Sequence, residues 1–301
     1  MNKWIKNYTL KVQGTDTLKE LHIIELPFTV EFNYINSVMG LVAEADFKIY
    51  NLKESVRNVL FKDWYEQDKK RYVAFYVGYG DSPMALFKGD CWTCYNQKTK
   101  TDWETSMTCH SAYSAMSGSY TSYTFDAGTT KSDNIRRLMN DIIKHNTNLS
   151  LGQLSIGKIS DYVDPVSKKP ITHLTSVTFK GTTSNVLKKY TQGDFFISNN
   201  KLYSLSKYDS VEGVVSVISS QTGLLGTPRR AKTYIEVDMI LEPNMRLFQY
   251  INLETKYKGF SGKYKVLGVI HTGTISGSVD SEATTTVTLG TDKTLAYEAI
   301  L

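Results

Sequence analysis

The chain has 301 residues, of which 41% are hydrophobic, 12% aromatic and 22% charged, and its formal net charge is +5. This length suits one large domain or two ordinary ones, and the composition excludes a disordered chain. A charge of +5 over 301 residues is too dilute to indicate a nucleic-acid-binding protein. No apolar run is long enough to span a bilayer and the first residues lack an apolar signal segment. We therefore expect a β-leaning chain that is made in the cytoplasm and is not exported by the general route.

The first 113 residues are expected to form an antiparallel β-domain with one short helix. In the first expected strand, apolar side chains alternate with Glu44, Asp46 and Lys48, which is typical of a strand with one buried and one polar face. The second expected strand is an almost unbroken apolar run, as in strands that are buried on both faces. The four expected strands are Gly40–Leu52, Arg71–Tyr79, Met84–Tyr95 and Trp103–Tyr113.

Helical periodicity is strongest in the middle of the chain, where residues 114–225 are expected to mix helix and strand. Apolar residues from Ile135 to Ile143 recur at helical spacing, and Ser132 or Asp133 is the expected N-cap. A shorter helix is expected around residues 186–190, and Asn51 is the expected cap of a helical turn in the first domain.

The last part of the chain returns to a β pattern. Before it, at the end of the middle part, Asn199 and Asn200 predict a tight hairpin, because asparagine tolerates a positive φ. Arg229 and Arg230 lie in a stretch with glycine and proline that could touch phosphate, although a solvated turn is the simpler interpretation. The segment from Gly273 to Ala283 is expected to be a polar loop. The strands expected in this part are Thr233–Leu241, Leu247–Leu253, Tyr264–His271 and Thr284–Leu289.

Cys91 and Cys94 form a CxxC motif, which occurs in redox pairs and in zinc sites. The motif lies inside a β-patterned run, where a spacing of three residues places the two side chains on opposite faces. Cys109 and His110 are adjacent and therefore also point in opposite directions. Three cysteines are an odd number, which argues against a disulfide framework. We predict unbridged, metal-free thiols that pack as small buried side chains.

The sequence contains no recognisable catalytic constellation. The five histidines lack metal-site spacing, and nucleophile-elbow, P-loop and dinucleotide-binding motifs are missing. Glu44 and Asp46 share a strand face and could in principle serve a glycosidase, but exposed strands commonly carry such pairs. We therefore assign no catalytic, cofactor-binding or metal-binding residue and expect no cofactor and no enzyme activity. The histidines are His22, His110, His145, His173 and His271.

The order of these elements resembles that of the baseplate hub proteins of tailed bacteriophages, the family that joins the tail tube to the central spike. The resemblance rests on short stretches rather than on one long motif, and Val77 stands where the family usually has alanine. The stretches that carry it are Ala43–Leu52, Tyr76–Gly80, Leu86–Asp90, Asp133–Leu149, Gln221–Pro228, Leu241–Asn244, Gly262–Val266 and a His-Thr-Gly loop at His271–Gly273.

The resemblance implies two related tail-tube-like antiparallel β-barrels, at residues 1–113 and 226–301, and a small α+β domain at 114–225. It also implies a homotrimer in which six barrels form a pseudo-sixfold ring within the virion. The tail tube protein would lie above the ring, the central spike below it and other baseplate proteins around it. Phage DNA would pass through the lumen without specific binding, and the face with Glu44, Asp46 and Lys48 is the candidate lumen or rim surface. The family has no catalytic residues.

Two other classes of function remain open at this point. A phage-encoded cell-wall hydrolase would require a pocket with paired, perturbed carboxylates or a nucleophile. A receptor-binding or carbohydrate-binding tail protein would require an exposed aromatic platform, for which the tyrosine-rich stretch Tyr113–Tyr123 is the candidate.

Overall fold

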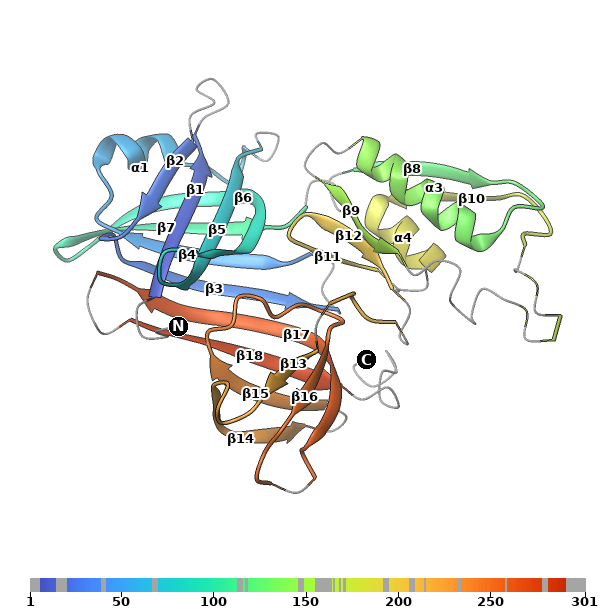
Figure 1. The fold of residues 1–301 in the computed structure, drawn as a ribbon. Coiled ribbons are helices and arrows are strands. Elements are labelled where there is room, and N and C mark those ends of the chain that lie inside the picture. Colours follow the sequence, from blue (N-terminus) through green and yellow to red (C-terminus); the bar gives the residue numbers. More distant parts are fainter. Residues whose placement is uncertain are drawn as a thin grey trace.

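The computed structural model contains a large antiparallel sheet with a smaller helical layer beside it (Figure 1). It describes the chain except for residues 1–5, 15–20, 39–41, 67–69, 113–115, 117–118, 146–148, 155–163, 165, 168, 170–171, 192–194, 206–208, 214, 232–233, 258, 278–280 and 291–301. Gly40, Tyr113 and Thr233, which bound predicted segments, therefore lie outside the described residues. The mainly β class expected from the sequence is confirmed.

The first part of the chain contributes seven strands and one helix to this architecture. The strand β4 has the alternating burial that the sequence predicts, with Glu44, Asp46 and Lys48 exposed. The strand β5 is largely buried on both sides, as expected. The elements are β1 (Lys6–Gln13), β2 (Leu21–Glu25), β3 (Val30–Ser37), β4 (Glu44–Tyr50), α1 (Glu54–Leu60), β5 (Tyr72–Tyr79), β6 (Met84–Thr99) and β7 (Asp102–His110).

The last part of the chain contributes six strands to the same sheet. The strand β15 places Ile235, Val237 and Met239 in the core, in agreement with the predicted alternation. The strands are β13 (Ser216–Ile218), β14 (Leu224–Ala231), β15 (Tyr234–Ile240), β16 (Tyr250–Leu253), β17 (Gly262–Ile275) and β18 (Glu282–Gly290).

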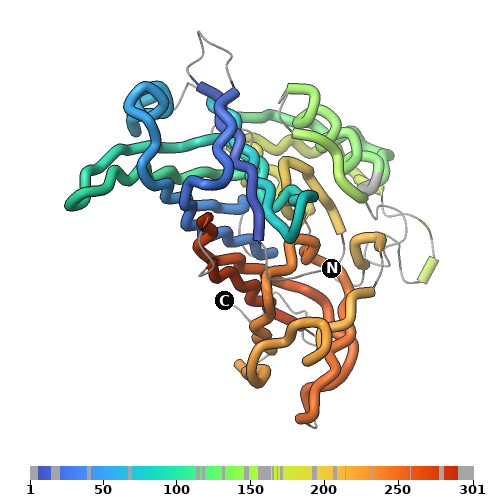
Figure 2. The backbone as a smooth tube through the Cα atoms, turned by 60° about the vertical axis from the view of Figure 1, so that its left-hand side comes forward, coloured from blue at the N-terminus to red at the C-terminus, as the bar shows by residue number. Residues whose placement is uncertain are grey.

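The two groups of strands meet along one ladder between β17 and β3, which runs from Gly268 opposite Ser37 to Ile275 opposite Val30. Figures 1 and 2 both show the orange-red strands directly beside the blue ones. The main strand order is β14-β15-β18-β17-β3-β4-β7-β6-β5-β1-β2, while β16 pairs with β17 and β13 pairs with β16. The ladder makes the two β segments one continuous sheet.

The middle of the chain forms a separate helical layer on two small sheets. The helix α4 packs on β8 and β10, and α3 packs on β9. Asn199 and Asn200 both have positive φ, at 50° and 56°, and join β11 to β12 in the predicted hairpin. The elements are β8 (Tyr120–Phe125), α3 (Lys131–Lys144), β9 (Ser150–Leu154), β10 (Val177–Thr182), α4 (Thr183–Thr191), β11 (Phe196–Ser198) and β12 (Lys201–Ser204).

The predicted helix caps are wrong. Thr130 caps α3, because its Oγ1 accepts a hydrogen bond from the Asp133 backbone N–H at 3.2 Å. Lys53 precedes α1 without a side-chain cap. Asn51 has a φ of 57° and binds the β6–β7 hairpin instead, donating to Asp102 at 2.9 Å and accepting from the Trp103 N–H at 3.0 Å.

Two predicted loops are also wrong. The stretch with Arg229 and Arg230 lies inside β14, where a bulge between Leu225 and Arg229 accommodates the glycine and proline. The predicted loop at Gly273–Ala283 is shorter than expected, because β17 continues to residue 275 and β18 begins at residue 282. Local composition was misleading at both places because cross-strand pairing outweighs it.

The opposite orientation of the two motif cysteines is wrong as well. The register of β6 shifts between Cys91 and Thr93, and this bulge returns Cys94 to the same buried side as Cys91. Cys109 lies directly opposite Cys91 on β7, so the core contains all three thiols. All three are free cysteines.

None of the helices among the described residues is both long enough and apolar enough to cross a membrane.

Candidate functional site

The sheet presents one broad solvent-facing surface, which we call the polar face. Residues that pair directly in antiparallel strands point to the same side of a sheet. The ladders therefore align side chains of β15, β18, β17, β3, β4 and β7 in rows. The first row consists of Ile240, Thr284, Thr272, Asn33, Asp46 and Thr108. The second row consists of Asp238, Thr286, Ile270, Ile35, Glu44 and His110. The third row consists of Glu282, Thr274, Glu31, Lys48 and Ser106. The polar face comprises these rows together with Glu104, Arg229, Glu236 and Thr288.

The underside of the same strands explains why this face is polar. Side chains between the rows, such as Phe32, Phe47 and Met107, are at most 4% exposed and pack in the core. Strand residues alternate between the two sides, so a buried apolar side leaves the intervening positions to solvent. The three residues Glu44, Asp46 and Lys48 predicted for this surface are indeed exposed on it.

Carboxylates dominate the charge of the polar face. It carries seven carboxylates and, as its permanent cations, Lys48 and Arg229, although the whole chain has a net charge of +5. Burial lowers the pKa of His110, against the attraction of Glu44 and Asp46, so this imidazole is neutral at pH 7. The carboxylates are Glu31, Glu44, Asp46, Glu104, Glu236, Asp238 and Glu282.

Most of these carboxylates contact a hydroxyl group or a basic side chain on the adjacent strand. The Thr108 hydroxyl donates to Asp46 at 2.8 Å, and the Tyr50 hydroxyl donates to Glu31 at 2.7 Å. Lys48 lies 3.6 Å from Glu104. Such cross-strand pairs hold the side chains along the sheet rather than directing them to a common centre.

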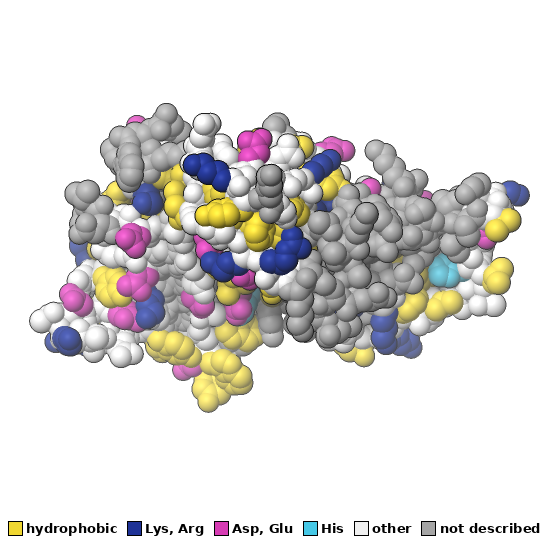
Figure 3. Space-filling model, turned by 90° about the horizontal axis from the view of Figure 1, so that it is seen from below, with side chains coloured by type: hydrophobic (Ala, Val, Ile, Leu, Met, Phe, Trp, Pro, Cys, Tyr) yellow, Lys and Arg dark blue, Asp and Glu magenta, His cyan; other side chains and the backbone are white. Residues whose placement is uncertain are grey.

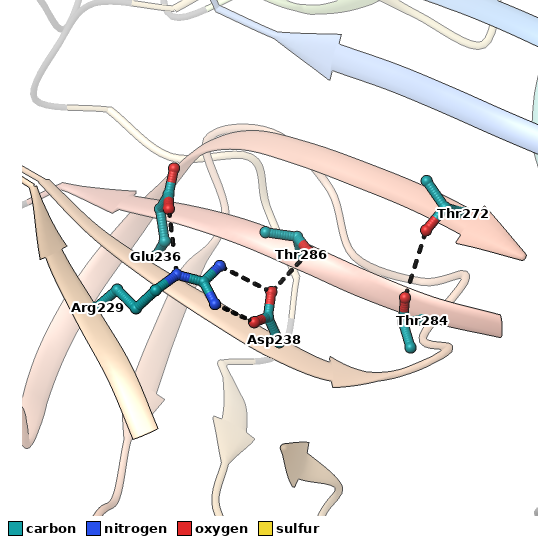
Figure 4. Close-up of polar contacts among 6 residues, drawn as sticks. All are labelled: Arg229, Glu236, Asp238, Thr272, Thr284 and Thr286. Carbon is teal, nitrogen blue, oxygen red and sulfur yellow. Dashed lines mark hydrogen bonds and ion pairs between the residues drawn. The ribbon is translucent and has the colours of Figure 1, made fainter. Parts of the chain in front are cut away.

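The C-terminal half of the polar face contains a group of polar contacts around Arg229 and Asp238 (Figure 4). Arg229 contacts both oxygens of Asp238, and its Nε lies 3.5 Å from Glu236. The Thr286 hydroxyl donates to Asp238 at 2.8 Å. Partial burial alone would raise the pKa of Asp238, but the bonds from Arg229 and Thr286 lower it. In the neighbouring row, the hydroxyl oxygens of Thr272 and Thr284 lie 3.4 Å apart.

An open hollow of 390 Å³ lies in the polar face where the two halves of the sheet meet. Carboxylates of Glu31, Asp46 and Glu282 surround it, together with Lys48 and threonines of β17 and β18. Gly273 is required here, because a side chain on it would meet the Glu282 carbonyl at 2.4 Å.

The histidines and cysteines do not form a reactive centre in the part of the chain that the structure describes. The five histidines lie on separate elements, and no group of three or more His, Cys, Asp or Glu side chains there is arranged to hold a metal ion. Glu44 and Asp46 are engaged by His110 at 3.7 Å and by Thr108. This arrangement offers a surface rather than a site for chemistry.

The tyrosine-rich stretch proposed for carbohydrate binding does not form an aromatic platform within its described residues. Tyr120 is 78% exposed, but Tyr123 packs against Phe125 in the middle layer. Large exposed aromatic side chains occur instead after α1, at Phe61, Trp64 and Tyr65. Seen from below, hydrophobic side chains (yellow) lie beside interspersed acidic (magenta) and basic (dark blue) side chains (Figure 3).

The sequence of the chain was then compared with known protein families. The profile of the family described as baseplate hub gp41 matches residues 8–266. The chain belongs to this baseplate hub family. The family consists of structural tail proteins, so the expectation that the chain is not an enzyme is confirmed. No curated protein matches the sequence.

Solved structures similar to this hub protein include two tail proteins and a type VI secretion component. The 43 kDa tail protein of prophage MuSo2 from Shewanella oneidensis has a TM-score of 0.60 and 8% identity, covering 96% of this chain and 99% of that one. A tail protein from Neisseria meningitidis MC58 has a TM-score of 0.60 and 9% identity, covering 95% and 97%. An E. coli type VI secretion component, described as similar to T4 tail proteins gp27 and gp5, has a TM-score of 0.52 and 6% identity, covering 87% and 72%. At these identities, the likeness concerns the fold.

Sequence reasoning found only part of the polar face. It identified β4 because a charged alternation is visible within seven residues. It missed the contribution of Arg229, Asp238 and the threonines of β18. Alternating Thr284, Thr286 and Thr288 were the available signal for a second polar strand face.

Proposed function

We propose that three copies of this chain close into a pseudo-sixfold ring that joins the tail tube to the central spike of a phage. Each copy would supply two tube-like β-barrel domains, at residues 1–113 and 226–301, and a small α+β domain at 114–225. Support for these divisions comes from three clusters of buried side chains, centred on the first β segment, the helical layer and the second β segment.

The observation that carries the proposal is the β17–β3 ladder. It sets the two β segments side by side and makes their polar sides one surface across six strands. A ring lining requires such a surface, because neighbouring segments must present the same side toward the axis. The sheet order of the described strands also ends in two free edges, β14 and β2. Closed rotational assembly is one way to cover such edges.

We further propose that the polar face lines the lumen. Phosphates of passing DNA bind to basic surfaces by releasing counterions, and a basic lining would retard the DNA. Seven carboxylates against two permanent cations give this face the opposite sign. Phage DNA would then pass without specific binding, with the tail tube protein above, the spike below and other baseplate proteins around the ring.

The proposal places the protein in the tail baseplate of the virion after synthesis in the host cytoplasm. The mass of the purified particle in solution tests the assembly. Light scattering after size-exclusion chromatography should give three times the 34.0 kDa of one chain. A stable particle with the mass of one or two chains at micromolar concentration would contradict the trimer.

A further inference from the structure

A second hollow lies where the three parts of the chain meet, on the other side of β3 and β17 from the polar face. We call it the junction cavity. Its volume is 430 Å³, and it is lined by residues of β3 and β6, by the β11–β12 hairpin, and by the segment after β15. Four buried or half-buried polar side chains on its wall are Tyr34, Asn36, Asn199 and His271.

His271 is fully buried on this wall, and its Nε2 atom has no hydrogen-bond partner among the described residues. Its other ring nitrogen, Nδ1, lies 2.8 Å from the Thr285 hydroxyl. That hydroxyl already accepts a bond from the Glu242 backbone N–H at 2.8 Å, so its own proton is available to Nδ1. This assignment leaves the proton of the neutral ring on Nε2, which is then a buried donor without an acceptor.

Asn199 adds a second buried polar group without a partner. Its Oδ1 atom is buried and unbonded among the described residues. Because an amide group can present either its oxygen or its NH₂, Asn199 can turn two donors toward a ligand. Buried polar groups are nearly always satisfied, by protein, ordered water or ligand, so two orphans in one cavity require an explanation.

The charge of the junction cavity selects the kind of ligand. Lys201 and Arg246 lie at its edge and are exposed, and neither forms an ion pair with a described residue. No Asp or Glu is among the described residues of its wall. The nearby Glu242 carboxylate accepts instead from the Asn244 backbone N–H at 3.2 Å. The buried His271 donor without an acceptor and the cations without carboxylates both favour an anionic ligand.

We propose that the junction cavity is a binding site for an oxyanion, either a free small anion or a carboxylate of a polypeptide. Lys201 and Arg246 attract the anion, and the side chains of His271 and Asn199, whose Nε2 and Oδ1 atoms are closed to solvent in this structure, rotate to donate hydrogen bonds to it from the wall. The inference goes beyond the hub function and does not depend on ring formation. A ligand there would contact all three parts of the chain and hold them in one arrangement.

Isothermal titration calorimetry on the full chain in chloride buffer tests this site. The probes are inorganic phosphate, citrate and the peptide acetyl-Asp-Asp-amide. Saturable one-to-one binding of phosphate or citrate supports a free anion, and binding of the peptide alone supports a polypeptide source. The variant Lys201→Gln/Arg246→Gln should weaken binding by about tenfold. Both side chains are exposed, so this variant is expected to fold.

The matched control is Lys98→Gln/Arg136→Gln, which removes the same charges from exposed positions outside the cavity. It should bind like the unaltered protein. The ¹⁵N resonance of His271 Nε2 should also shift on saturation with the ligand that binds. Absence of binding by all three probes, equal weakening in the two double variants, or an unshifted His271 resonance would each overturn the proposal.

Discussion

The guanidinium group of Arg229 contacts both carboxylate oxygens of Asp238 across the β14–β15 ladder, at a place where the sequence suggested a solvated loop. The contact is possible because the bulge in β14 shifts the register and brings Arg229 opposite Glu236, one pair away from Asp238. Asp238 also accepts from Thr286, so the pair links three adjacent strands.

Replacement of Arg229 by alanine should lower the free energy of unfolding by about 1 kcal/mol or less, because the guanidinium is 56% exposed and solvent screens the pair. The pKa of Asp238 is lower in the folded state than in the unfolded state. The ion pair with Arg229 therefore stabilises the fold fully above the unfolded-state pKa, and this stabilisation disappears as the pH falls through the folded-state pKa. Urea denaturation should therefore show a larger loss at pH 7 than at pH 3. Arg230→Ala is the control, since Arg230 binds a carbonyl of Gly259 and no carboxylate of the described residues. An equal pH dependence in both variants would contradict this explanation.

Replacement of Leu138 by aspartate should destabilise the helical layer by about 3 kcal/mol or more, because an unpaired charge would enter its core. Leu138 is fully buried in α3 with Ile135 and Met139. Thermal unfolding checks this, with Arg137→Asp at an exposed position of the same helix as the control. An unchanged melting temperature for Leu138→Asp would show that this helix face is not buried.

The three thiols should be free and metal-free in the purified protein, although all of them lie in one core. Burial raises the pKa of Cys94 and Cys109, which disfavours the thiolate that binds metal or attacks a disulfide. A hydrogen bond with Cys109 lowers the pKa of Cys91, but this thiol is only 2% exposed and is shielded from reagents. Alkylation should label no cysteine before denaturation and three after it, without added reductant. Stoichiometric zinc, or a mass that reveals a bond between Cys91 and Cys109, would refute the prediction.

Reversal of charge on the polar face should create affinity for DNA. In the variant Glu44→Lys/Asp46→Lys, two exposed carboxylates become cations, and the assembled particle should bind duplex DNA at least about tenfold more tightly at low salt. Fluorescence anisotropy with labelled DNA measures this. Asp81→Lys/Glu212→Lys makes the same charge change at exposed positions outside the polar face. Equal tightening in both variants would mean that net charge alone matters and that the polar face is not the lining.

Features set by a few neighbouring residues could be predicted from the sequence. The Asn199–Asn200 hairpin is one, because both residues need only their own tolerance of positive φ. The alternation in β4 is another, because burial of one side is visible in the order of residues. These two features locate one strand of the polar face and one wall of the junction cavity.

Features that depend on distant partners could not be predicted. The common orientation of Cys91 and Cys94 depends on a bulge opposite β7, and a regular strand pattern gives no sign of it. The union of the two β segments depends on pairing between β3 and β17, which are separated by more than half of the chain. Long-range pairing of this kind is encoded by packing rather than by local propensity.

The central claim is that the polar face lines a ring made by three copies of this chain. An electron-microscopy reconstruction of the purified particle, calculated without imposed symmetry, tests it most directly. The account predicts threefold symmetry, six β lobes around an open centre, and Glu44, Asp46 and Asp238 facing that centre. A ring with these residues on its outer surface, or a particle in which single copies do not close around a lumen, would contradict the account.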